Sequence, residues 1–355
     1  EYLLYLLYFP KLAQGPIALP QEMLTQFRNR MRGRLDRDRI LRGLLLFIFG
    51  LAKKVLYADT LSPLVQQGFA QTDYLDTLTV LLLLITYAFQ LYFDFSGYCD
   101  MAMGISEMLM IALPVNFDRP FQADGIGDFW KRWHATLSRF FVRYVYIPLG
   151  GSRRGGIRTF GNILIIFLLS GLWHGIGATY LLWGAINGLF VALSHGLLSL
   201  RKKRMIDGQT TAASKGETSG IRRLFTRVSV FAAFLFTLIF FRAESVGKAV
   251  MMLKRLCIPL YPGFLYRIAE HLEFTELYPV IKGITMAFPG SEGIVKLFLW
   301  VLLVALGFFL ISRRNAWEIA KNCRLTGRLA IGMGLLFAWS VLAFNNVGTF
   351  LYFAF

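Results

Sequence analysis

The feature that most constrains the fold of this chain is an apolar run over residues 161–200. A helix needs ~20 residues to cross a bilayer, so this run is long enough to cross nearly twice. His174 is the titratable group in the middle of the run, and glycines at 171, 175 and 177 allow other backbone or a substrate to come close. An ionisable group inside a membrane indicates a functional site. The alternative is a buried histidine that only hydrogen-bonds a neighbouring helix.

The composition agrees with a membrane protein. Of the 355 residues, 56% are hydrophobic, which exceeds the apolar share of ordinary soluble domains. The net charge of +17 does not predict a nucleic-acid partner, because the basic residues cluster in short segments between apolar spans, as the positive-inside rule predicts. The three cysteines, Cys99, Cys257 and Cys323, have no CxxC spacing and predict neither a disulfide framework nor a metal site.

Hydropathy therefore predicts an all-α integral membrane protein, read as one transmembrane domain over residues 1–355. The lysine and arginine bias places residues 28–42, 201–227 and 313–328 in the cytoplasm, with 201–227 as a flexible loop and 243–294 as an extracytoplasmic segment. The chain begins inside an apolar run, so we expect it to be the later part of a longer protein. After the end of a span at 2–9, the predicted spans cover 40–57, 77–93, 161–175, 177–200, 224–241, 295–311 and 329–344.

The segment between the second and third complete spans predicts an amphipathic helix over residues 128–146, with Asp128 as the N-cap. Its aromatic and apolar face carries Trp130, His134, Leu137 and Phe141, and the opposite face carries Arg132, Thr136, Arg139 and Arg143. Such a helix lies at a membrane surface or lines a polar cavity. His134 favours the cavity, because it sits among the aromatic residues rather than with the arginines.

Common catalytic signatures are absent from the sequence, which has no GxSxG, Walker A, GxGxxG or HExxH pattern. His195 lies near the cytoplasmic end of its span and is interpreted as structural. His134 and His174 remain as candidates for acid–base chemistry, because a buried neutral imidazole near a hydroxyl can serve as a general base. Lys131 with Arg132, Arg139 and Arg143 could hold the phosphates of a carrier such as coenzyme A, although positive-inside bias alone could also explain them.

Three motifs resemble the membrane-bound O-acyltransferase family, and most of all its bacterial branch that holds the alginate O-acetyltransferase membrane subunit. They are Asp-Phe-Trp-Lys-Arg-Trp-His at 128–134, Tyr-Ile-Pro-Leu-Gly-Gly at 146–151 and Leu-Trp-His-Gly at 172–175. The similarity continues, in order along the chain, at Phe9-Pro10 with 13–17, at 94–98 with Asp100-Met101, at 241–245 and at 352–355.

The resemblance implies a multi-span helical fold with a central funnel and re-entrant or amphipathic helices. It implies that His174 is the catalytic residue and His134 the second active-site residue. The Pro-Leu-Gly-Gly motif favours the polysaccharide-acetylating branch over the teichoic-acid D-alanylating branch. Relative to the family, the first several spans would be missing from this chain. Asp94, Ser96, Asp100 and Trp173 are second-tier candidates, since an acidic residue at the end of a span can be only a cap.

The sequence therefore predicts an O-acyltransferase of a bacterial cytoplasmic membrane, with no bound cofactor or metal. Acetyl-CoA would be the donor. The acceptor would be an exported polysaccharide, reached directly or through a secreted or periplasmic partner acetyltransferase. One alternative within the family is transfer of D-alanyl or another acyl group from a carrier protein. The alternative of a different class is a non-catalytic polysaccharide transporter, which would more often show repeated halves, and none is visible.

Overall fold

The computed structural model describes residues 1–30, 35–206, 220–273 and 278–346, and every regular element within these ranges is a helix. Among the described residues, five helices are long and apolar enough to cross a membrane. They are α6 (Thr77–Met108), α9 (Gly156–His174), α10 (Ala178–Ile206), α11 (Gly220–Arg242) and α15 (Glu292–Ile311). The predicted all-α membrane class is confirmed. These helices contain the spans predicted at 77–93, 224–241 and 295–311, and all but one residue of those predicted at 161–175 and 177–200.

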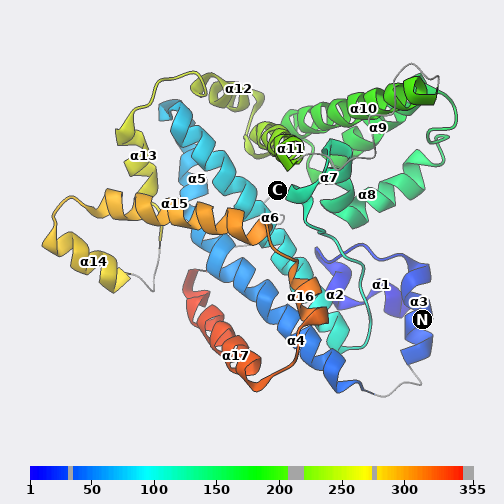
Figure 1. Cartoon of the computed structure of the whole chain (residues 1–355), viewed down its shortest axis with the longest axis horizontal. Coiled ribbons are helices and arrows are strands. Elements are labelled where there is room, and N and C mark those ends of the chain that lie inside the picture. The colour runs from blue at the N-terminus through cyan, green and yellow to red at the C-terminus, as the bar shows by residue number, and fades with distance from the viewer. Residues whose placement is uncertain (31–34, 207–219, 274–277, 347–355) are drawn as a thin grey trace. The chain divides into compact units, whose positions relative to one another are not determined.

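The chain forms two compact units, one of residues 1–116 with 251–355 and the other of residues 117–250 (Figure 1). The single domain predicted over 1–355 stays a prediction. Besides α6 and α15, unit 1 contains α1 (Tyr2–Leu6), α2 (Phe9–Leu12), α3 (Pro20–Arg30), α4 (Arg37–Ala52), η1 (Lys53–Asp59), α5 (Thr60–Ala70), η2 (Thr72–Tyr74), α13 (Pro262–Ala269), α14 (Tyr278–Ala287), α16 (Ala316–Asn322), α17 (Gly327–Leu342) and η5 (Ala343–Asn346). Besides α9 to α11, unit 2 contains η3 (Pro120–Gln122), α7 (Ile126–Arg132), α8 (Ala135–Phe141) and η4 (Val142–Tyr146), and α12 (Val246–Arg255) crosses the boundary.

In unit 1, α4 and α6 lie side by side because glycines on both helices let the backbones approach (Figure 1). A Cβ atom added to Gly50 would lie 2.5 Å from the carbonyl oxygen of Gly97, and one added to Gly104 would lie 2.6 Å from the carbonyl oxygen of Gly43. Small residues at such contacts are a common means of helix association in membranes, where hydrophobic burial drives little helix pairing.

Two boundaries predicted in unit 1 are wrong. The span predicted to end at residue 93 continues without a break to Met108, so Asp94 and Asp100 lie inside α6 rather than at its end. The span predicted over 40–57 runs from Arg37 through the π-helical turn η1 into α5, which ends at Ala70, so residues 58–70, outside the predicted spans, are helical as well. In both places a charged residue marked the end of the predicted span. In the fold these residues, Asp94 and Asp59, are both paired with Lys54.

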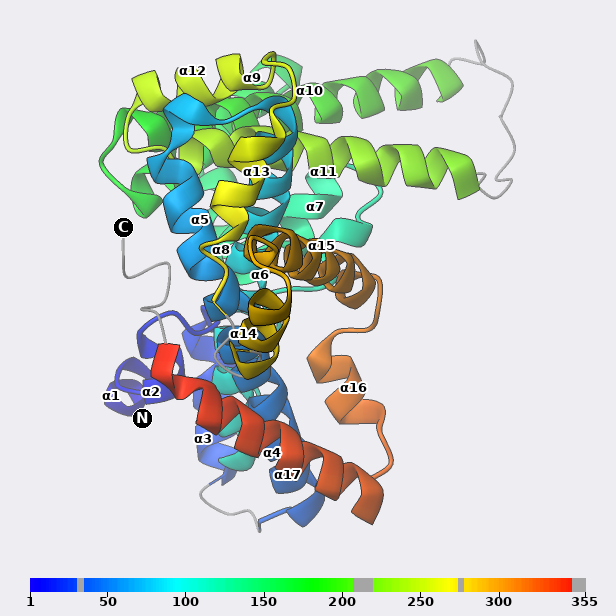
Figure 2. The same cartoon turned by 90° about the vertical axis from the view of Figure 1, so that its left-hand side faces the viewer.

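Unit 2 is organised around α9, α10 and α11, which lie side by side; Figure 2 shows them from a second direction. Gly171 on α9 and Gly184 on α10 set the close approach of these two helices. A Cβ atom added to Gly171 would lie 2.4 Å from the carbonyl oxygen of Tyr180, and one added to Gly184 would lie 2.3 Å from that of Phe167. Gly171, one of the glycines around His174 in the apolar run, therefore serves helix packing.

The side of the membrane on which several segments lie stays a prediction. Of the loop predicted over 201–227, residues to Ile206 and from Gly220 are helical, and residues 207–219 lie outside the described residues. The segment predicted over 243–294 contains α12, α13 and α14. The last predicted span, 329–344, corresponds to the apolar helix α17, and the motif at 352–355 lies outside the described residues.

Candidate active site

His134 interrupts the amphipathic helix that was predicted over residues 128–146. Its φ of 45° is left-handed, a conformation that costs free energy for a residue with a Cβ atom, and it separates α7 from α8. The helix begins at Ile126 rather than after Asp128, and the predicted single aromatic face does not exist. Strained backbone of this kind is concentrated at functional sites, where surrounding contacts hold it in place.

The break at His134 is held by hydrogen bonds to the carbonyl groups that α7 leaves unpaired. The Ser138 hydroxyl donates to the carbonyl oxygen of Trp130 at 2.8 Å, and the backbone N–H of Asp118 donates to that of Arg132 at 3.0 Å. The last carbonyl groups of a helix have no partner within the helix, so these contacts stabilise its end. They fix the position from which the His134 side chain leaves the backbone.

The side chain of His134 is 9% exposed. Burial, and secondly the nearby His174, lower the pKa of His134 from 6.5 to about 3. The imidazole is therefore neutral at physiological pH and can both donate and accept a hydrogen bond. Because His174 contributes to the lowered pKa of His134, the two residues predicted as the catalytic pair lie near one another in unit 2.

His174 is the last residue of α9, and two aromatic rings from other helices contact its ring. Trp183 of α10 and Phe241 of α11 lie with ring centroids 5.3 and 5.2 Å from the imidazole centroid. Next to it, Gly175 leaves space for the ring of Tyr180, because a Cβ atom at Gly175 would lie 2.4 Å from that ring. Three helices thus fix the orientation of the His174 ring.

Two indole N–H groups near His174, those of Trp183 and of its neighbour Trp130, have no acceptor within the described residues. Trp130 of α7 packs against Trp183 with ring centroids 5.6 Å apart. Within the described part of the chain neither indole nitrogen has a hydrogen-bond partner, although both atoms are buried. Buried donors are almost always paired, and an unpaired one costs ~1–3 kcal/mol. Trp183 could not be singled out from the sequence, because one tryptophan in an apolar run forms no pattern.

The four basic residues predicted to bind a donor do not share one helix. Lys131 and Arg132 end α7, whereas Arg139 lies in α8 and Arg143 in η4, beyond the break. The guanidinium of Arg132 donates to the Asp128 carboxylate at 2.9 Å, so Asp128 serves as an ion-pair partner rather than as an N-cap. Lys131 and Arg143 are exposed and Arg139 is half-buried.

The Pro-Leu-Gly-Gly motif forms a turn directly before α9. Gly150 and Gly151 have φ values of 98° and 56°, which glycine adopts without strain. The side-chain amide of Asn162 on α9 donates to the carbonyl oxygen of Gly151 at 3.0 Å and ties the turn to the helix. Trp173, a second-tier candidate, is 61% exposed, and His195 is also exposed.

Two other second-tier candidates, Asp94 and Asp100, form ion pairs with lysines in unit 1. The Lys54 ammonium donates to the carboxylates of Asp59 and Asp94, at 2.6 Å each, and Lys53 donates to Asp100 at 2.5 Å. Ser96, two residues after Asp94 on α6, is also buried, and its hydroxyl has no hydrogen-bond partner within the described residues. Sequence reasoning missed both lysines, although two adjacent lysines at the end of an apolar run were a visible signal.

Comparison with known proteins agrees with these motifs. Residues 1–216 match the MBOAT, membrane-bound O-acyltransferase family. The chain is 36% identical over 254 residues to the peptidoglycan O-acetyltransferase of Helicobacter pylori, covering 72% of this chain and 46% of that protein. It is 39% identical over 189 residues to the probable alginate O-acetylase AlgI of Pseudomonas aeruginosa, covering 53% of this chain and 36% of that protein.

A more distant relative is the teichoic acid D-alanyltransferase of Bacillus subtilis, 27% identical over 209 residues, which are 57% of this chain and 53% of that protein. The chain thus matches about half the length or less of these curated relatives. The family match covers more than half of the chain and includes both histidines and the turn between them. The chain belongs to the membrane-bound O-acyltransferase family.

Proposed function

We propose that this chain transfers an acyl group, most simply acetyl from acetyl-CoA, in a bacterial cytoplasmic membrane for the O-acetylation of an exported or cell-surface polysaccharide. Two of the relatives are named as acetylating enzymes of peptidoglycan and alginate, and all of those named come from bacteria. The observation that carries the proposal is that His134, which is buried, and His174, which is half-buried, lie near one another in unit 2.

In this proposal His174 is the general base. It takes the proton of the acceptor hydroxyl while the hydroxyl oxygen attacks the carbonyl carbon of the donor thioester. A new C–O ester bond forms, the C–S bond breaks, and the leaving thiolate receives the proton from His174. The base contributes roughly 10²–10⁴ in rate to such a reaction. The aromatic contacts of Trp183 and Phe241 with the His174 ring support a fixed orientation for this step.

His134 would position His174 and the reacting groups. As a neutral group it can both donate and accept a hydrogen bond. The unpaired indole N–H groups of Trp130 and Trp183 would donate to the acyl oxygen, where negative charge develops during attack. Hydrogen-bond donors placed for such an oxygen are among the largest contributions to acyl-transfer catalysis.

The donor would approach from the cytoplasmic side, where Lys131, Arg132, Arg139 and Arg143 supply positive charge for its phosphates. Transfer would end on a polysaccharide directly or on a secreted partner acetyltransferase. A second candidate is D-alanyl transfer from a carrier protein, which the similarity to teichoic acid D-alanyltransferases favours. The Pro-Leu-Gly-Gly motif at 148–151 supports acetyl transfer instead, because it resembles the polysaccharide-acetylating branch of the family.

The test is the substitution His174→Gln in the full-length protein in its host membrane, with labelled acetyl-CoA and, in parallel, labelled D-alanine. Glutamine keeps hydrogen-bonding groups of similar size but cannot take the proton. Acetyl transfer per folded molecule should fall by roughly 10²–10⁴, and His195→Gln on the exposed side of α10 is the control. Membrane level and melting temperature give the folded fraction. Near-normal transfer in His174→Gln would reject the base, and label from D-alanine alone would select the second candidate.

A further inference from the structure

Four aromatic side chains from four helices of unit 2 form a connected wall beside His174. Trp183 and Phe241 contact the histidine directly, and Trp130 and Phe167 continue the wall from Trp183. We propose that this aromatic wall is an acyl-length filter, which admits a two-carbon acyl group to His174 and excludes longer acyl groups. The inference rests on the proposed acyl transfer and specifies which donors that site uses.

Neighbouring rings of the aromatic wall touch one another. Trp183 and Phe241 lie with their centroids 5.2 Å apart, and each residue is 3% exposed. Trp130 meets Trp183 at 84° and Phe167 at 74°, with centroids 5.6 and 5.4 Å away. In edge-to-face pairs at such distances the atoms of the two rings are in contact, so a methylene group does not fit between them. The aromatic wall is therefore closed along these pairs.

The reacting acyl group lies within reach of the aromatic wall. In the proposed reaction the acceptor hydroxyl is at hydrogen-bond distance from the imidazole of His174, ~3 Å, and the thioester carbon lies directly beyond the hydroxyl oxygen. The centroids of Trp183 and Phe241 are only 5.3 and 5.2 Å from that of His174. His174 is half-buried, and the adjacent Trp173 is exposed. Donor and acceptor enter from this open side, which leaves the walled side for the acyl substituent.

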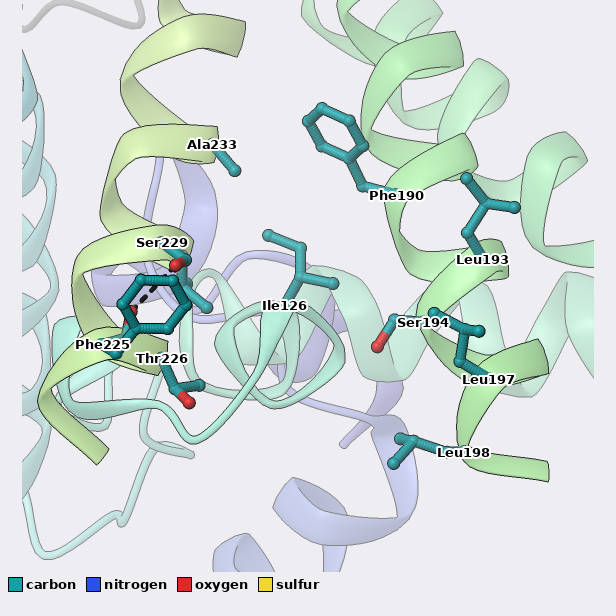
Figure 3. A pocket seen from close by; sticks show the side chains of 11 residues that line it. Ile126, Phe190, Leu193, Ser194, Leu197, Leu198, Phe225, Thr226, Ser229 and Ala233 are labelled. Carbon is teal, nitrogen blue, oxygen red and sulfur yellow. Dashed lines mark hydrogen bonds between the residues drawn. The ribbon is translucent and has the colours of Figure 1, made fainter. Parts of the chain in front are cut away.

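An apolar groove elsewhere in unit 2 does not supply room for a longer acyl chain. It lies between α10 and α11, and its lining includes Phe190 and Ala233 (Figure 3). Phe190 follows Trp183 by seven residues on α10, and Ala233 precedes Phe241 by eight residues on α11. These separations are ~10 and ~12 Å along a helix. His174 is not among the lining residues, so the groove leaves the space beside the histidine unchanged.

The aromatic wall predicts a preference among acyl donors. Propionyl adds one methylene group to acetyl and butyryl adds two, and either has to displace a ring that its neighbours hold in place. One methylene group too many in an apolar site changes kcat/KM by roughly 10–200-fold. The bond changes are the same for all three donors, because the ester C–O bond forms, the thioester C–S bond breaks and the thiol leaves with the proton. The preference therefore measures the space beside His174.

The test compares acetyl-CoA, propionyl-CoA and butyryl-CoA as donors for the full-length protein in its host membrane. We expect the parent protein to prefer acetyl over propionyl by roughly 10–200-fold in kcat/KM. Phe241→Ala removes one ring of the wall and keeps both indole N–H groups, so it should lower this preference by roughly ten-fold. Phe240→Ala is the matched control, because Phe240 is also buried on α11 and its ring contacts Phe236. It should keep the preference of the parent protein.

Melting temperatures show whether each variant is folded, and Phe241→Leu is the milder substitution that replaces Phe241→Ala if that variant does not fold. Equal use of acetyl and propionyl by the parent protein would overturn the inference and leave the proposed acyl transfer intact. An unchanged preference in the folded Phe241 variant, or an equal loss in Phe240→Ala, would also overturn it. If the parent protein uses none of the three donors, the proposed transfer from coenzyme A fails, and the acyl-length filter fails with it.

Discussion

The rings of His174 and Trp183 meet at 88° with their centroids 5.3 Å apart, and the indole of Trp183 is 3% exposed. The same indole touches Phe241 and Trp130, with centroids 5.2 and 5.6 Å away. Trp183 thus joins residues of α7, α9 and α11 around the proposed base. Its N–H has no acceptor within the described residues, so the site contains one feature that packing alone does not explain.

The first prediction concerns this N–H. Trp183→Phe keeps an aromatic ring against His174 and removes the donor. If the indole donates to the acyl oxygen in the transition state, kcat should fall by roughly 10²–10³ while the KM for the donor changes little. Steady-state kinetics with labelled acetyl-CoA measure both constants, and the melting temperature reports packing. A variant with unchanged kcat, or one that changes only KM, would exclude this role.

The second prediction concerns the pH dependence of stability. The folded pKa of His134 is about 3 and its ordinary value is 6.5, so acidification protonates this residue in the unfolded chain first. The free energy of unfolding should therefore fall as the pH drops below 6.5 toward 3. From about pH 7.5 to about pH 5 the loss from this one group is about 2 kcal/mol.

His134→Asn removes this titration, and asparagine tolerates the left-handed backbone at this position better than alanine does. Chemical unfolding at the two pH values should show a smaller acid loss in His134→Asn than in the parent chain. His195→Asn, at an exposed position on α10, is the matched control. If the variant and the parent lose the same stability on acidification, His134 is not a buried neutral group.

The position of His174 could be predicted from the sequence because it depends on local information. The apolar run, the glycines and the motif around His174 all lie within residues 161–200. The neighbouring spans could be predicted because hydropathy is also a local property of the sequence. The backbone at His134 could not be predicted, since no glycine or proline marks the break, and the hydrogen bonds that hold it come from Asp118 and Ser138. Periodicity therefore extended one helix through a residue with a positive φ.

The continuation of α6 beyond Phe93 was missed for a different reason. Asp94 looked like the end of a span because a carboxylate in hydrocarbon is costly. Its partner Lys54 lies on a different helix, at the π-helical turn after α4, and no window along the sequence connects the two. An ion pair between distant segments exists only in the folded chain. A hydropathy window therefore counts its charged residues as unpaired and ends the predicted membrane helix too early.

The third prediction tests the close approach of α9 and α10. Gly171→Ala would place a Cβ atom 2.4 Å from a backbone oxygen of Tyr180, so the two helices would have to separate. We expect a loss of about 1–3 kcal/mol of stability. Gly161→Ala on the same helix is the control, because no atom lies within 4 Å of the added Cβ. Melting temperatures in detergent compare them, and equal values would contradict a packing role for Gly171.

The fourth prediction concerns the buried charges of unit 1. Lys54→Met leaves the carboxylates of Asp59 and Asp94 buried without their common partner, and loss of one partner of a buried ion pair costs about 3–5 kcal/mol. Adding Asp59→Asn and Asp94→Asn to Lys54→Met should restore much of that stability, because neutral amides are less costly to bury than unpaired charges. Lys321→Met, at an exposed position on α16, should have little effect. The comparison of single and triple variants by melting temperature measures the coupling directly.

If the triple variant is as unstable as the sum of its single substitutions, Lys54, Asp59 and Asp94 do not act as one ionic cluster, and the burial of Asp94 must be explained by another contact.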